Sequence, residues 1–135
     1  MKIVIIIPCY NEEQILEKNI LKILDAVKSI PQDIKIIISD NNSKDKTSEI
    51  GKQLVLKNSN LEYVFVGEPG KGAAVLEAWK KYDADIYGFM DADLATDLDV
   101  LPKTIKFFEE GYDAVIGSRR IKGANVKREL YRKFT

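Results

Sequence analysis

The sequence contains no histidine and a single cysteine, Cys9. Because no imidazole is present, acid–base chemistry must come from carboxylates, lysines, tyrosines or the substrate itself. For the same reason, a metal site cannot depend on histidine. A single cysteine excludes a disulfide within the chain and suits a reducing compartment, so we expect a cytoplasmic protein.

The chain also lacks a net charge and a long apolar run. Its 21 Lys and Arg residues balance 21 Asp and Glu residues, so no overall field draws it to nucleic acid or a membrane. The apolar run after Lys2 stops at Pro8, which is too short for a signal peptide or a membrane span. Basic residues do gather between Arg119 and Lys133. This segment is either a solvated helix face or a peripheral contact with anionic lipid or an acceptor phosphate.

With 135 residues, 45% of them hydrophobic and 31% charged, the chain has the size and composition of one soluble domain. Apolar runs rich in β-branched and aromatic residues predict strands, and a helix is expected after each of the first four. We expect Asn11 to cap the first helix and a Thr96–Asp99 capping box to open the fourth. The expected strands are 3–7, 36–38, 63–66, 86–90 and 112–116. This alternation predicts one α/β domain, residues 1–135, with a mainly parallel sheet flanked by helices.

Polar residues, glycines and prolines follow each predicted strand at its carboxyl end. These clusters are 8–12, 40–45, 70–72, 91–93 and 117–119. Open α/β sheets bind their ligands outside the carboxyl ends of the strands. The sequence therefore predicts a ligand site at this edge of the sheet.

Asp91 and Asp93 are the most informative pair, because they directly follow the apolar run 86–90. Two residues apart in extended chain, their side chains point to the same side. A divalent cation with a preference for oxygen ligands would relieve the repulsion between them. The pair is therefore either a metal site that holds a diphosphate or a solvated turn with helix-capping acids.

The other clusters offer groups that suit a nucleoside diphosphate. Lys71 lies between two glycines before a helix, where its amine and the backbone N–H groups could meet anionic oxygens. Asp40 could accept from a base or a ribose hydroxyl, Tyr10 could lie against either, and Arg119 could pair with phosphate. Each also has a simpler interpretation, namely a plain loop, an Asx turn, an exposed tyrosine and a surface arginine. Glu12, in a first helical turn, is most simply explained by the helix dipole.

Common nucleotide-binding signatures are missing from the sequence. Residues 8–10 stand where a dehydrogenase carries G-x-G-x-x-G, and no G-x-x-x-x-G-K-[ST] occurs. Hydride transfer and a P-loop NTPase are therefore disfavoured. A phosphotransferase with an aspartyl nucleophile is disfavoured too, because that family carries its Asp-x-Asp after the first strand and not after the fourth.

Four motifs taken in order resemble family 2 glycosyltransferases with the GT-A fold, and most of all the dolichyl-phosphate glucosyl- and mannosyltransferase branch. They are residues 6–13 (IIPCYNEE), 40–47 (DNNSKDKT), 70–74 (GKGAA) and 90–94 (MDADL). The resemblance implies a Rossmann-like, three-layer α/β/α domain that binds a nucleotide sugar. It also implies an inverting transfer of a hexose from a UDP- or GDP-sugar to an acceptor, here a polyprenyl or dolichyl phosphate.

The resemblance also assigns residues. Asp91 and Asp93 would be the catalytic carboxylates that reach Mg²⁺ or Mn²⁺. The implied donor-binding residues are Pro8, Tyr10, Glu12, Asp40, Lys71, Asp91, Ala92, Asp93 and Arg119. A phosphate acceptor is already an anion and needs no strong base, which agrees with the absence of histidine.

The sequence departs from the family pattern at three positions. Asn41 stands for a second acid, Asn42 for a glycine and Ala95 for a frequent glutamine. The chain ends soon after the fifth expected strand, so we expect only the N-terminal part of the usual enzyme, without its acceptor-side region. The alternatives are a nucleotidyltransferase that makes nucleotide sugars and a non-catalytic nucleotide-binding fragment. The nucleotidyltransferase usually carries a Gly-rich basic loop after its first strand, which residues 8–11 are not.

Overall fold

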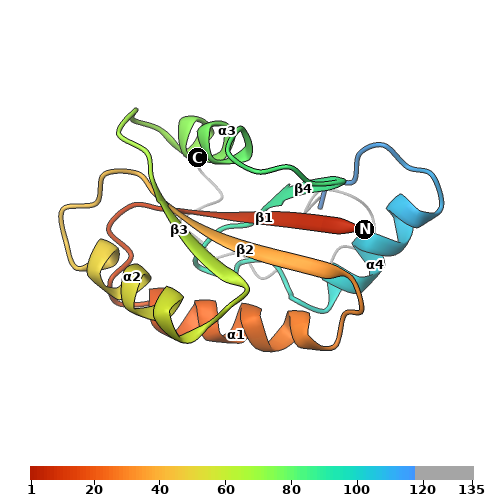
Figure 1. The fold of residues 1–135 in the computed structure, drawn as a ribbon, viewed down its shortest axis with the longest axis horizontal. Helices are drawn as coiled ribbons and strands as arrows, with labels where there is room; N and C mark the ends of the chain where they lie inside the picture. Colours follow the sequence, from red (N-terminus) through yellow and green to blue (C-terminus); the bar gives the residue numbers. More distant parts are fainter. Residues whose placement is uncertain (118–135) are drawn as a thin grey trace, which may run out of the picture. The chain divides into compact units, whose positions relative to one another are not determined.

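The computed structural model describes residues 1–117, and the chain forms two compact units, Met1–Val100 and a second that begins at Leu101. The first unit holds four strands and three helices, and the second holds nearly all of a fourth helix (Figure 1). In chain order the elements are β1 (Lys2–Cys9), α1 (Leu16–Lys28), β2 (Asp33–Asp40), α2 (Thr47–Lys57), β3 (Leu61–Phe65), α3 (Lys71–Trp79), β4 (Ile86–Phe89) and α4 (Val100–Glu109). No helix among residues 1–117 is long and apolar enough to cross a membrane.

The four strands form one parallel sheet in the order β3-β2-β1-β4, which confirms the predicted sheet. β1 is central because its apolar run 3–7 is buried on both faces, as expected of an inner parallel strand. Cys9 lies opposite Asp40 in the β1–β2 ladder, and Ile6 lies opposite Phe89 in the β1–β4 ladder. The carboxyl ends of β1, β2 and β4 therefore come to one edge.

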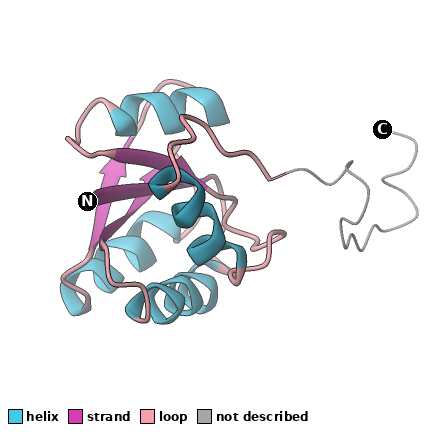
Figure 2. Ribbon diagram, turned by 90° about the vertical axis from the view of Figure 1, so that its right-hand side faces the viewer, coloured by secondary structure: helices cyan, strands magenta, loops and turns pink. Residues whose placement is uncertain are grey.

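Helices cover both faces of this sheet, with α3 on one face and α1 and α2 on the other (Figures 1 and 2). α1 buries Leu16, Ile20, Ile23, Leu24 and Val27, which is the stripe that its sequence predicts. On the opposite face α3 contributes Val75 and Ala78 to a core that also contains Val4, Ile6, Ile37, Val64 and Val66. The first unit thus has the predicted three layers.

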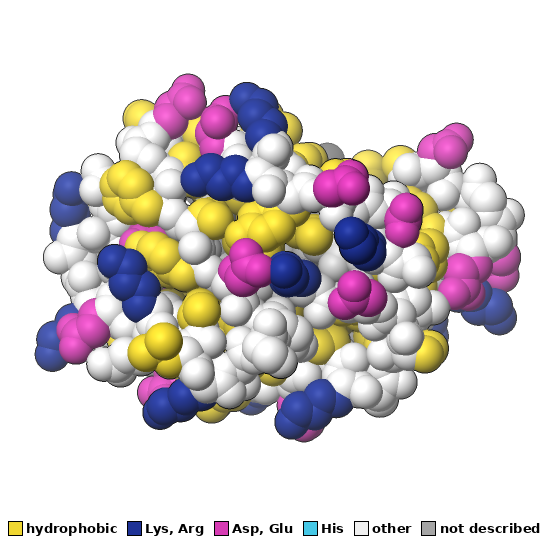
Figure 3. All heavy atoms as spheres, viewed as in Figure 1, with side chains coloured by type: hydrophobic (Ala, Val, Ile, Leu, Met, Phe, Trp, Pro, Cys, Tyr) yellow, Lys and Arg dark blue, Asp and Glu magenta, His cyan; other side chains and the backbone are white. Residues whose placement is uncertain are grey.

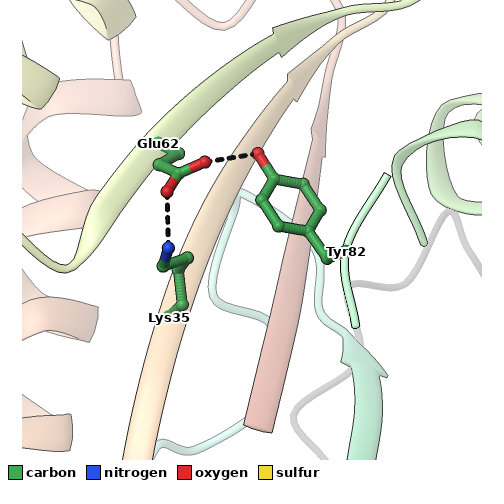
Figure 4. Close-up of polar contacts among 3 residues, drawn as sticks. All are labelled: Lys35, Glu62 and Tyr82. Carbon is green, nitrogen blue, oxygen red and sulfur yellow. Dashed lines mark hydrogen bonds and ion pairs between the residues drawn. The ribbon is translucent and has the colours of Figure 1, made fainter. Parts of the chain in front are cut away.

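Polar contacts tie the edge strand β3 to its surroundings (Figure 4). Lys35 of β2 pairs with Glu62 of β3, with 2.6 Å between Nζ and Oε1, and Tyr82 donates to Glu62 Oε2 at 2.7 Å. The hydrogen bond from Lys35 lowers the pKa of Glu62. Burial, and then the hydrogen bond to Glu62, raise the pKa of Tyr82.

Elsewhere, acidic and basic side chains are interspersed over the face drawn in Figure 3, in keeping with the balanced composition.

Three local predictions were wrong. The segment 112–116 forms no strand within the described residues, and Ile116 is 87% exposed, because β propensity needs a paired, half-buried surface. Asn11 does not cap α1, which begins at Leu16. Its backbone takes φ 51°, and its side chain accepts a hydrogen bond from the Lys44 N–H. α4 begins only at Val100, after a turn in which Asp97 accepts from the Asp99 N–H.

The close approach of α2 to β3 predicts a stability difference between two glycines. A Cβ on Gly51 would lie 3.0 Å from Cδ2 of Tyr63, whereas a Cβ on Gly72 would meet nothing within 4 Å. Gly51 lies inside α2 and Gly72 is the second residue of α3, so the gain in helix propensity is at least as large at Gly51, and a lower stability of its variant reports packing. We expect Gly51→Leu to be less stable than Gly72→Leu by about 1–3 kcal/mol, as measured by urea unfolding. Equal stabilities would contradict this packing.

Candidate functional site

A cavity of about 210 Å³ lies at the carboxyl edge of the sheet. It is lined by Pro8, Cys9, Tyr10, Glu12, Asn41, Lys71, Ala74, Asp91, Ala92 and Asp93, all of which belong to the first unit. Seven of the nine residues assigned from the sequence are therefore brought together, from segments far apart in the chain. Asp40 and Arg119 are the other two.

Carboxylates dominate one part of this cavity. Burial raises the pKa of Glu12, and the negative charges of Asp93, Asp45 and Asp91 raise it further. The carboxylates of Glu12, Asp91 and Asp93 thus repel one another, which is the electrostatic condition for a bound cation. Within residues 1–117, however, no group of three or more Asp, Glu or Cys side chains is arranged to hold a metal ion by itself.

The Asp91–Asp93 turn is anchored to α1. Asn19, in the first turn of α1 and 9% exposed, donates from Nδ2 to the Ala92 carbonyl at 2.8 Å. Asp93 accepts from the Ala95 N–H at 3.0 Å, and Leu94 sits at φ 53°. Ala92 is consequently buried, while Asp91 and Asp93 on either side of it are exposed to the cavity. Asn19 was not among the site residues predicted from the sequence. The signal that could have identified it is a polar residue within the apolar stripe of α1.

Lys71 brings the positive charge into the cavity. It is the first residue of α3, and its Nζ forms an ion pair with Asp91. The same Nζ lies 5.5 Å from the centre of the Phe89 ring. About half of each charged side chain is exposed, so the ion pair contributes little to stability. Lys71 and Asp91 can therefore each exchange this contact for one with a ligand.

The segments after β1 and β2 hold each other in place through reciprocal hydrogen bonds. The Glu12 N–H donates to Oγ1 of Thr47 at 2.8 Å, and the Asn11 N–H donates to Oγ of Ser43 at 2.9 Å. In return, the Lys46 N–H donates to the Glu13 carboxylate at 3.1 Å. These bonds fix the backbone at Glu12, whose side chain lines the cavity.

Asp40 does not line the cavity. It is 1% exposed, its Oδ1 accepts from the Ser43 N–H at 3.0 Å, and its Oδ2 accepts from the Tyr63 hydroxyl at 2.5 Å. Here it organises the turn after β2, and its expected contact with a nucleobase stays a prediction. Arg119 lies outside the described residues.

The sheet, its two helical layers and the cavity at its carboxyl edge define a Rossmann-like α/β/α protein. The family model described as glycosyl transferase family 2 matches residues 4–134. The chain belongs to this family, which confirms the resemblance seen in its motifs.

Two curated relatives match nearly the whole chain. A dolichol-phosphate mannosyltransferase of Pyrococcus furiosus is 35% identical over 99% of this chain, and an undecaprenyl-phosphate 4-deoxy-4-formamido-L-arabinose transferase of Photorhabdus laumondii is 32% identical over 98%. The chain spans only 38% and 40% of the lengths of these two relatives.

A solved structure supports the fold. The mannosyltransferase of Pyrobaculum calidifontis, in complex with GDP-Man and Mn²⁺, superposes with a TM-score of 0.67 at 24% identity, over 78% of this chain and 32% of that one. The fold of this chain is thus that of the GT-A glycosyltransferases.

The burial of Asp40 leads to a prediction about Tyr63. Burial, and then the hydrogen bond to Asp40, raise the pKa of Tyr63 from 10.0 to about 12. Tyr63→Phe leaves Oδ2 of a buried carboxylate without this donor, so we expect the free energy of unfolding to fall by about 1–3 kcal/mol at neutral pH. Tyr10→Phe, which changes an exposed tyrosine, should change stability by less than about 0.5 kcal/mol.

The pH dependence of this difference has a definite sign. The raised pKa means that the unfolded state loses the Tyr63 proton first, so the contribution of Tyr63 is complete below pH 10 and lost as pH rises towards about 12. Urea unfolding of both proteins across this range should show the gap between wild type and Tyr63→Phe closing. A gap that widens with pH would contradict the assignment.

Proposed function

We propose that this chain is the donor-binding part of an inverting glycosyltransferase, which transfers a hexose from a UDP- or GDP-sugar to a polyprenyl phosphate. One observation carries the proposal: acidic and basic residues from three separate segments line a single cavity at the carboxyl edge of the sheet. The names of the two relatives, a dolichol-phosphate and an undecaprenyl-phosphate transferase, support the acceptor, and the solved mannosyltransferase with GDP-Man supports the donor.

Mg²⁺ or Mn²⁺ is the cofactor we propose, held by Asp91 and Asp93. The residues fit such an ion, because Mg²⁺ is usually held by one or two carboxylates together with phosphate oxygens of the substrate and needs no complete protein cage. Two exposed acids beside a third of raised pKa meet this description. When bound, the ion neutralises negative charge that develops on the departing nucleoside diphosphate.

The side chains around this ion have distinct proposed roles. Lys71, and Arg119 from outside the described residues, bind the diphosphate oxygens and stabilise the leaving group. Tyr10, which is 58% exposed at the cavity, lies against the base or ribose, with Pro8 beside it. Glu12 forms part of the pocket wall. The contact of Asp40 with the base, which the family resemblance implies, requires Asp40 to exchange a bond to Ser43 or Tyr63 for one to the base.

The acceptor side of the proposal depends on charge. The phosphate of a polyprenyl phosphate is already an anion and can attack the anomeric carbon without a strong base, which suits a chain that has no histidine. We propose that the reaction takes place at the cytoplasmic face of a membrane, where the basic segment 119–133 would meet anionic headgroups.

Calorimetry with UDP and GDP, each with and without Mn²⁺, tests the proposal. We expect one of the two nucleotides to bind, and Mn²⁺ to tighten its binding. Asp91→Asn and Asp93→Asn should each abolish the effect of Mn²⁺, because each removes a charged ligand. Asp33→Asn, at the exposed amino end of β2, should keep it. A folded wild-type chain that binds neither nucleotide would refute the proposal.

The ion pair of Lys71 with Asp91 predicts opposite effects on metal and nucleotide. In Lys71→Met, Asp91 loses a competing cation, so Mn²⁺ alone should bind about two- to five-fold more tightly, as expected for an exposed pair of up to ~1 kcal/mol. The nucleotide should bind about ten-fold more weakly or worse, because a charge-assisted hydrogen bond is lost. Both constants can be measured by calorimetry.

Lys80→Met is the matched control for this experiment. Lys80 pairs with Glu77 at 2.7 Å and does not line the cavity. Lys80→Met removes one positive charge, as Lys71→Met does. A similar change in the dissociation constant of Mn²⁺ or of the nucleotide would show that net charge, and not the contact with Asp91, is responsible.

A further inference from the structure

The side chain of Asn41 joins the end of β2 to the loop that precedes α3. Its Nδ2 donates to the Val66 carbonyl at 3.0 Å and to the Glu68 carbonyl at 2.6 Å, and its Oδ1 accepts from the Gly70 N–H at 2.9 Å. The Asn41 N–H itself donates to the Cys9 carbonyl at 2.8 Å, so the residue is anchored to the central strand β1. One side chain therefore holds three backbone groups of the loop 66–70.

Only a primary amide can make this set of bonds from this position. Both amide hydrogens and one lone pair of the oxygen are used, and the three partners fix which end of the amide is which. An aspartate has the same shape but would turn an acceptor oxygen towards two carbonyl oxygens, losing two donors and adding repulsion. A leucine of similar size would lose all three bonds without adding charge.

The loop that Asn41 holds determines where α3 begins. Residues 67–70 are exposed, and Gly70 takes φ 111°, a backbone conformation that favours glycine. No side chain caps the N-terminus of α3, and the Gly70 carbonyl accepts the first helical bond, from the Ala74 N–H at 3.0 Å. Lys71 comes next, with its amine in the cavity. Hydrogen bonds of Asn41 to Cys9 and to Gly70 thus connect the start of α3, and with it Lys71, to β1.

We propose that Asn41 is a positioning residue, which sets the first turn of α3 so that Lys71 meets the diphosphate of the donor. This rests on the proposed function in one step, the binding of the diphosphate by Lys71. The hydrogen bonds of Asn41 are needed because an exposed loop would otherwise be free to shift, and a displacement of about 1 Å can remove most of the benefit of a placed charge.

Hydrogen exchange tests the bonds without any nucleotide. In the wild-type chain, the Gly70 amide should exchange more slowly than the neighbouring exposed amide of Gly67, because Asn41 accepts its hydrogen. In Asn41→Leu, which removes the acceptor oxygen, this protection should disappear, while the amides of β1 keep theirs. A Gly70 amide that is unprotected in the wild type would overturn the proposal, even if the variant does not fold.

A double-mutant cycle tests the positioning role with UDP or GDP and Mn²⁺. We expect Asn41→Leu to weaken nucleotide binding about ten-fold in the wild-type background and less than about two-fold in the Lys71→Met background, because residues that act as a unit are not additive. An equal loss in both backgrounds would show a merely structural role. Weakening by Asn41→Asp but not by Asn41→Leu would show an effect of charge alone, and would also overturn the proposal.

Asn58→Asp provides the matched control. Asn58 also donates its amide to a backbone carbonyl, that of Leu54 at 2.8 Å, but it ends α2 and does not line the cavity. It should leave nucleotide affinity unchanged; a loss equal to that of Asn41→Asp would overturn the assignment. If the wild-type chain binds no nucleotide, the proposed function fails, whereas binding without coupling between Asn41 and Lys71 refutes the positioning role alone.

Discussion

The pairing of β1 with β2 on one side and with β4 on the other is the constraint on which the site depends. Both ladders are parallel, so all three strands end at the same edge of the sheet. The register places Cys9 beside Asp40, and the Met90 N–H continues the other ladder by donating to the Ile6 carbonyl at 3.0 Å. The chain that follows β4 must therefore leave next to the chain that follows β1. The acid pair and Glu12 meet for this reason.

The charges of the cavity are unequal, and this gives the site its chemistry. Among the described residues that line it, Glu12, Asp91 and Asp93 are acidic and Lys71 is basic. The excess of carboxylate suits a divalent cation, while the lysine suits the phosphates that such a cation accompanies. Lys71 already contacts Asp91. Binding of a metal by Asp91 and of a nucleotide by Lys71 would therefore replace an existing ion pair.

The backbone around the cavity is held by side chains that do not carry charge into it. Thr47 is fully buried and fixes Glu12, Asn19 fixes Ala92, and Asn41 fixes Gly70. Each of these side chains bonds to backbone that is distant in sequence, which joins the loops after the strands into one frame. Such preorganisation is what places a charged group for catalysis without further cost at the moment of reaction.

Much of the fold could be read from the sequence, because its signals are local. The apolar run of β1 and the stripe of α1 report burial directly, through the periods of strand and helix. The same reasoning failed at 112–116, where an apolar run stands without a strand partner in the described chain, and at Asn11, where a capping residue bonds to Lys44 instead. The first case depended on the absence of a strand partner within the described residues, and the second on the presence of a partner distant in sequence.

The sequence by itself determined the parallel α/β sheet, the family and seven residues of the cavity wall, because strand-end position and motif spacing are properties of a linear chain. Only the tertiary structure decided that Asp40 is buried under Tyr63, that Lys71 contacts Asp91, and that Asn41 carries the loop before α3. The physical reason is that hydrogen bonds and ion pairs have a reach of a few ångströms. Which groups come within that reach is set by the packing of segments that are distant along the chain.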